Sequence, residues 1–122
     1  MAPVYVFLGG GLGSLCRYAI GSLFPEASSH YGTLMANFLA CLTLGILMGL
    51  SGKGLMQDHH KLLLMTGFCG GFSTFSTFSY ELVKLNDNSG ILLAFCHMAL
   101  SIIVGVSAIL AGLWLSGVVQ QR

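Results

Sequence analysis

The chain has 122 residues, of which 55% are hydrophobic and only 7% are charged, and its formal net charge is +1. Soluble domains carry about 25% charged residues, so these charges are too few to cover a surface that faces water. The small net charge also argues against a nucleic-acid-binding surface. The composition therefore predicts an integral membrane protein whose outer surface mostly faces the lipid bilayer.

Four apolar segments follow one another along the chain, separated by short polar breaks. A membrane-spanning helix needs about 20 predominantly apolar residues. The fold class predicted for the single domain, residues 1–122, is an all-α membrane protein with four transmembrane helices. Their expected spans are residues 3–24, 32–50, 62–82 and 91–119, with the third polar break at residues 84–90.

The loop charges and the glycines indicate how the helices assemble. One side of the membrane would carry Lys53, Lys61 and Arg122 and the other only Lys84, a weak bias that permits insertion in both orientations. Glycines at four-residue spacing, such as 9 and 13 or 67 and 71, let helix backbones approach closely in lipid. Four short helices enclose little interior, so we expect a homodimer.

The first two spans each contain a costly polar residue. Arg17 lies inside the first span, where a charge is expensive unless it snorkels to the headgroups, pairs or faces water. It either snorkels or places a positive charge at the mouth of an anion path. Asn37 in the second span either bonds to a neighbouring helix or donates N–H groups that replace water around an anion. Thr33, one turn earlier, points to the same side.

The third span is the most unusual. Its sequence from residue 67 to 79 is GFCGGFSTFSTFS. After the glycines, every position is either a phenylalanine or a hydroxyl residue, Ser or Thr. Glycine weakens a helix, and Ser and Thr compete for its backbone hydrogen bonds. We therefore expect the helix to break near residues 70–74. Free carbonyls at such a break suit a small cation such as Na⁺.

Other residues near this break have two open interpretations. The rings of Phe72, Phe75 and Phe78 either pack or point positive edges at a small anion. Glu81, at the end of the span, is either a further candidate for the site or a headgroup-level acid paired with Lys84 at i+3. In the fourth span, His97 and Ser101 either line a polar track or pair between helices. The chain shows no nucleophile–base pair, carboxylate pair or phosphate loop, so an enzyme is not predicted.

Three of these motifs together resemble the Fluc fluoride channels, also called the CrcB family. They are GFCGGFSTFSTF at residues 67–78, GGGLGSLCRY at residues 9–18 and GTLMAN at residues 32–37. The resemblance covers all four spans. It implies an antiparallel, dual-topology homodimer in the bacterial inner membrane, crossing it several times. Such a dimer holds two fluoride pores and a structural Na⁺ at its centre, and passes F⁻ passively out of the cytoplasm.

The resemblance also implies roles for particular residues. It matches the backbone carbonyls of Gly70 and Ser73 to the Na⁺ ligands. It matches the fluoride path to six side chains: Asn37, Thr74, Phe75, Phe78, Ser101 and His97. This chain departs from the family's common pattern at Ser73, where Thr is usual, at Phe72, where an aliphatic residue is usual, and at His97, where Tyr is usual.

Two other classes of protein fit the length and the four spans. A small proton-coupled exporter of cationic drugs needs an acidic residue inside the first span, and this chain has Arg17 there. An assembly subunit without transport activity would use Asn37, Ser73 and Thr74 only to join helices. Fluoride sensitivity of cells that lack the gene would separate such a subunit from a channel.

Overall fold

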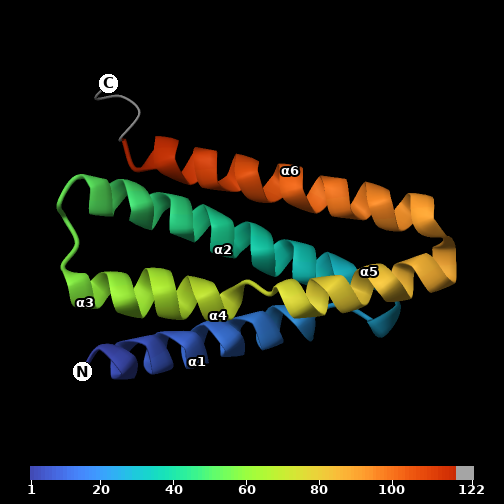
Figure 1. The fold of residues 1–122 in the computed structure, drawn as a ribbon, viewed down its shortest axis with the longest axis horizontal. Helices are drawn as coiled ribbons and strands as arrows, with labels where there is room; N and C mark the ends of the chain where they lie inside the picture. The colour runs from blue at the N-terminus through green and yellow to red at the C-terminus, as the bar shows by residue number, and fades with distance from the viewer. Residues whose placement is uncertain (118–122) are drawn as a thin grey trace.

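The computed structural model describes residues 1–117, which form helices and turns without a β-strand. Four helical rods lie side by side (Figure 1). The first is α1 (Ala2–Gly21), and the short helix η1 (Glu26–Ser28) leads into the second, α2 (Ser29–Gly52). The third runs from α3 (Asp58–His60) through the π-helix η2 (Lys61–Cys69) and α4 (Gly70–Phe72) to α5 (Phe75–Ser89). The fourth is α6 (Ile91–Leu115).

Two helices of the described residues are long and apolar enough to cross a membrane by length and composition, Glu26–Gly52 and Ile91–Leu115. They contain the predicted second span and the fourth as far as residue 115, whereas its residues 118 and 119 lie outside the described part of the chain. The first helix is less apolar because it carries Arg17 and several glycines. The third rod is divided between shorter helices. The spans at residues 3–24 and 62–82 therefore stay predictions.

Residues 84–89 of the polar break, expected to lie in a loop between spans, are helical, whereas Gly90 forms the predicted turn. Helix α5 continues to Ser89, so Lys84 and Asn86 are helical, and the chain turns only at Gly90 with φ 89°. Glycine reaches such a positive φ without the steric penalty that a Cβ atom brings. Polar composition marked where lipid contact is expected to end, but the helix itself continues beyond that point.

Glycines bring the backbone of α1 against the third rod. A Cβ atom added at Gly9 would overlap the Leu63 carbonyl oxygen, and one at Gly13 would overlap the Phe68 carbonyl oxygen. Glycine spacing in α1 therefore sets this close approach. Helix α4, which packs on α1, contributes Phe72 to a small core cluster with Ala36 and Ala40 of α2.

Candidate functional site

The third rod changes conformation at Ser73 and Thr74, which we call the extended segment. Ser73 has φ −76° and ψ 154°, and Thr74 has φ −149° and ψ 125°, both in the extended region. Helix α4 ends just before them and α5 begins just after them. The Thr74 hydroxyl caps α5 by accepting a hydrogen bond from the Thr77 N–H at 3.3 Å.

Asn37 of α2 fastens this segment to the neighbouring helix. The Thr74 N–H donates to Asn37 Oδ1 at 3.0 Å, and Asn37 Nδ2 donates to the Thr74 carbonyl at 3.5 Å. In a continuous helix the Thr74 N–H would bond to the carbonyl of Gly70. Asn37 takes that donor instead. The structure thus gives Asn37 an interhelical hydrogen bond while leaving its second amide N–H for other partners.

The carbonyl groups around the extended segment divide into occupied and open ones. The Gly71 carbonyl accepts from Ser14 Oγ at 3.4 Å and from Arg17 Nε at 3.3 Å. Among the described residues, no hydrogen bond reaches the Ser73 carbonyl oxygen. Gly70 and Ser73 both line a cavity of about 140 Å³ between the second and third rods. The two predicted Na⁺ ligands therefore share one small cavity.

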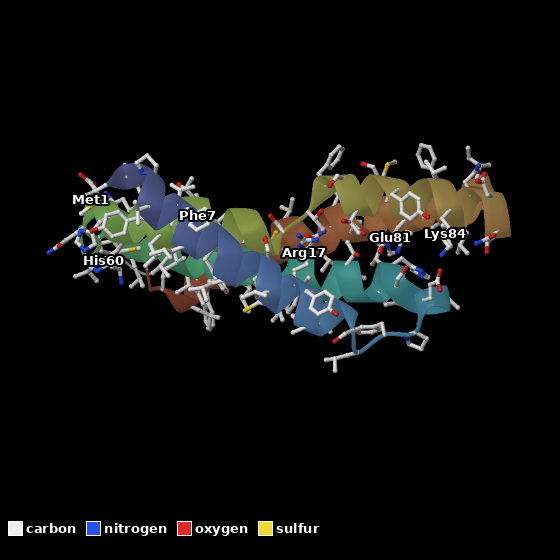
Figure 2. The ribbon with its side chains drawn as sticks, turned by 90° about the horizontal axis from the view of Figure 1, so that it is seen from below. Met1, Phe7, Arg17, His60, Glu81 and Lys84 are labelled. Carbon is white, nitrogen blue, oxygen red and sulfur yellow. The ribbon has the colours of Figure 1, made fainter. Side chains whose placement is uncertain are left out.

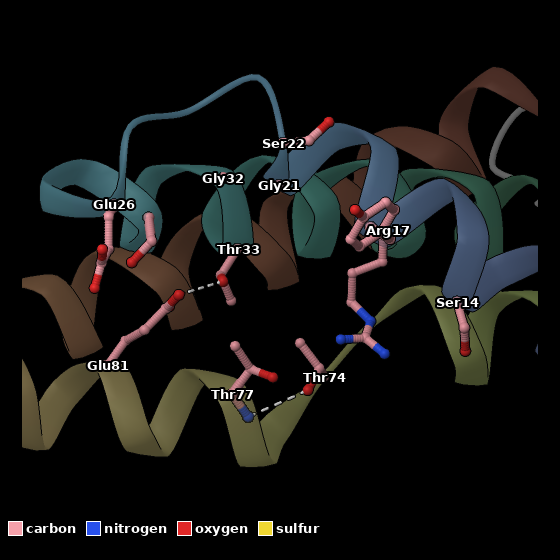
Figure 3. Close-up of a pocket in the computed structure, with 12 residues that line it drawn as sticks. Ser14, Arg17, Gly21, Ser22, Glu26, Gly32, Thr33, Thr74, Thr77 and Glu81 are labelled. Carbon is pink, nitrogen blue, oxygen red and sulfur yellow. Dashed lines mark hydrogen bonds between the residues drawn. The ribbon is translucent and has the colours of Figure 1, made fainter.

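A larger cavity, the polar cavity, lies on the other side of the segment. Its volume is about 930 Å³, and Arg17, Thr33, Thr74, Thr77 and Glu81 are among its lining residues (Figure 3). Arg17 extends into it from α1 and lies near the middle of the molecule's long axis (Figure 2). The three candidates that the sequence left with open roles, Arg17, Thr33 and Glu81, thus meet in one place.

Glu81 is not a headgroup-level acid paired with Lys84, as the i+3 spacing suggested. Only 6% of Glu81 is exposed, and its Oε1 accepts a hydrogen bond from Thr33 Oγ1 at 2.8 Å. Lys84 instead lies 3.3 Å from the carboxylate of Glu26 on η1. The packing of α2 beside α5 brings the Thr33 hydroxyl to Glu81, although the two residues are 48 positions apart in the sequence. Residue spacing within one helix cannot predict such a contact.

A second cavity, the ring cavity, has a volume of about 360 Å³ and contains most of the predicted fluoride path. Its lining includes Asn37, Thr74, Phe75, Phe78 and Ser101. The two ring centroids are 6.4 Å apart, and the ring planes are inclined by 50°. Thr74 lines both the polar cavity and the ring cavity. It is therefore the point at which a route between them would pass.

His97 is the predicted path residue that does not line the ring cavity. Its ring centroid lies 6.2 Å from that of Phe78, and its carbonyl accepts a hydrogen bond from Ser101 Oγ at 2.8 Å. Ser14 and Thr77 are among the hydroxyl residues of the polar cavity that sequence reasoning missed. Thr77 lies at i+3 from Thr74, the spacing of a capping interaction, and Ser14 lies in the glycine-rich first motif.

The fold and this site define a small helical membrane protein with polar cavities on both sides of an extended segment. The family model described as "CrcB-like protein, Camphor Resistance (CrcB)" matches residues 4–113. The chain therefore belongs to the CrcB family.

Similar proteins carry the name "Fluoride-specific ion channel FluC". One from Gloeothece citriformis is 42% identical over 114 residues, which are 90% of this chain and 92% of that protein. One from Flavobacterium psychrophilum is 37% identical, covering 89% and 91% of the two chains. One from Pyrococcus abyssi is 40% identical, covering 88% and 89%. These relatives are named as ion channels, and the family is not one of enzymes.

Proposed function

We propose that this chain forms a fluoride-selective channel that lets F⁻ leave the cytoplasm passively and so lowers its toxicity. The observation that carries the proposal is the position of Thr74, which lines both the polar cavity and the ring cavity. The names of the relatives support fluoride as the ion. The route would run from the polar cavity past Thr74 to the rings.

Fluoride holds its water strongly, so a path must replace those contacts. Asn37 offers its second amide N–H. The Thr74 hydroxyl accepts from Thr77 N and lies 3.5 Å from Ser76 Oγ, and it can donate its own proton to the ion when Ser76 is the donor of that pair or when it turns from Ser76. The edges of Phe75 and Phe78 carry partial positive charge. Ser101 lines the same cavity, although its hydroxyl must turn from the His97 carbonyl before it can donate to the ion. Several weak sites in series permit both entry and exit.

A structural Na⁺ fits the carbonyls of the small cavity that Gly70 and Ser73 line. The Gly70 carbonyl loses the Thr74 N–H to Asn37, and the Ser73 carbonyl has no hydrogen-bond partner among the described residues. Unpaired carbonyls at a helix interruption are suitable oxygen ligands for Na⁺. When bound, the cation would supply a positive field near the path, where charges interact more strongly than in water.

An antiparallel, dual-topology homodimer in the bacterial inner membrane is the assembly that we propose. Phe75 lines the ring cavity, yet 80% of it is exposed in a single copy of the chain. A second copy would cover this ring and seal the path from lipid. It would also bring a second set of Gly70 and Ser73 carbonyls to the Na⁺. The weak loop-charge bias is compatible with two opposite orientations.

The test is fluoride efflux from liposomes that contain the purified protein. Phe75→Ile and Phe78→Ile should each lower the flux, because they remove a ring edge. Phe95→Ile is the matched control, since Phe95 is 63% exposed on α6 and lines neither cavity of the path. Unchanged flux in both ring variants would contradict the path described here.

A further inference from the structure

Two histidines from different helices face each other beside the ring cavity. His30 lies near the start of α2 and His97 in α6, with ring centroids 5.0 Å apart and ring planes at 90°. Only 7% of His97 is exposed. Its Nε2 atom is buried and has no hydrogen-bond partner among the described residues. Buried polar atoms are rarely left in this state.

Glu81 presents the second atom of this kind. Its Oε2 is buried and has no partner within the described part of the chain, whereas Oε1 is held by Thr33. His30 and Glu81 line one cavity of about 130 Å³, together with Glu26 and Lys84. The carboxylate of Glu26 is already paired with the Lys84 ammonium. The carboxyl group beside His30 that forms no ion pair among the described residues is therefore that of Glu81.

The groups that face the histidine pair come from three helices. Helix α5 contributes Phe78, Glu81 and Lys84, and η1 contributes Glu26. Helix α2 also contributes Tyr31, whose ring lies 4.2 Å from His30 and 6.4 Å from His97. The pair thus has a carboxylate on one side and a ring of the proposed fluoride path on the other.

We propose that His30 and His97 form a proton-binding site, and that a proton bound there increases fluoride flux. Histidine is the side chain that ordinarily changes charge between pH 5 and 8. Protonation turns an imidazole acceptor into a second N–H donor. It also places a positive charge beside Phe78, a ring of the proposed fluoride path.

This inference rests on the proposed channel function and predicts a direction with pH. The site is occupied at low pH and empty at high pH, so flux rises as pH falls. Fluoride efflux from liposomes is measured with equal pH on both sides, and the leak of protein-free liposomes is subtracted at each pH. Between about pH 8 and about pH 5.5, the unmodified protein should gain about three- to tenfold in flux.

Glutamine variants separate the histidine pair from other titrating groups. His97→Gln should lose the rise at low pH, because an amide does not titrate in this range. The readout is the ratio of flux at low pH to flux at high pH within each variant, so a change in overall flux does not affect it. His30→Gln should reduce the rise or move it to another pH. The matched control is the double variant His59→Gln/His60→Gln, which removes a second adjacent pair with centroids 4.1 Å apart. That control should keep the full rise.

The outcomes distinguish the two proposals. Flux that is present but independent of pH in the unmodified protein overturns the proton site and leaves the channel function standing. The same rise in His30→Gln and His97→Gln as in the unmodified protein also overturns it. No fluoride flux at any pH contradicts the proposed function itself. If His97→Gln does not fold, the pH profile of His30→Gln decides, because His30 is only half-buried.

Discussion

Replacing Asn37 by alanine is expected to destabilise the protein by about 1–3 kcal/mol. The substitution removes the bond from the Thr74 N–H at 3.0 Å and the one to the Thr74 carbonyl at 3.5 Å. The second is at the limit of useful geometry, so the first dominates. Interhelical hydrogen bonds in membranes contribute about 0.6 kcal/mol on average. The part-buried Thr74 N–H left without a partner brings the total cost to about 1–3 kcal/mol.

The assay is unfolding of the protein in mixed micelles, followed by fluorescence of its single tryptophan, Trp114. Thr43→Val is the control on the same helix, because the Thr43 hydroxyl donates only to the Leu39 carbonyl of its own helix at 2.8 Å. It should cost no more than about 0.5 kcal/mol. Fluoride flux should fall in Asn37→Ala and persist in Thr43→Val. Equal stability of the two variants would refute the role given to Asn37.

Three further results are expected. Gly13→Ala should prevent tight packing of α1, since its Cβ would overlap the Phe68 carbonyl, whereas Gly11→Ala, with nothing within 4 Å, should unfold like the unmodified protein; equal unfolding curves would contradict this. Thr33→Val should cost about 1.5–3 kcal/mol in the same unfolding assay, because it leaves the Glu81 carboxylate without its donor; a loss below that of Thr43→Val would argue against it. Replacing Na⁺ by K⁺ throughout purification should abolish fluoride flux, and restoring Na⁺ should recover it; full flux without Na⁺ would remove the cation from the account.

The helical class and the grouping of the ring-cavity residues follow from sequence patterns. Hydropathy located the apolar helices, and the spacing of hydroxyls and phenylalanines pointed to the residues from Thr74 to Phe78. Hydropathy did not locate the end of α5, because a helix can continue into water after its lipid contacts stop. Lys84 and Asn86, assigned to a loop, are helical for that reason.

The partners of buried polar groups required the tertiary structure. Lys84 was predicted as the partner of Glu81, because the spacing of residues within one helix is the only geometry that the sequence provides. The packing of helices distant in sequence supplied Thr33 instead. In the same way, Asn37 was predicted as either a helix-joining group or an ion ligand. Its bond to the Thr74 backbone arises where the extended segment meets α2.

The most direct test of the central claim compares F⁻ and Cl⁻ efflux from liposomes that contain the purified protein. The account predicts rapid F⁻ efflux and Cl⁻ efflux no faster than from protein-free liposomes, because the path offers hydrogen-bond donors and ring edges that replace the water around a small, strongly hydrated anion. Equal F⁻ and Cl⁻ rates, or F⁻ efflux at the protein-free rate, would contradict it.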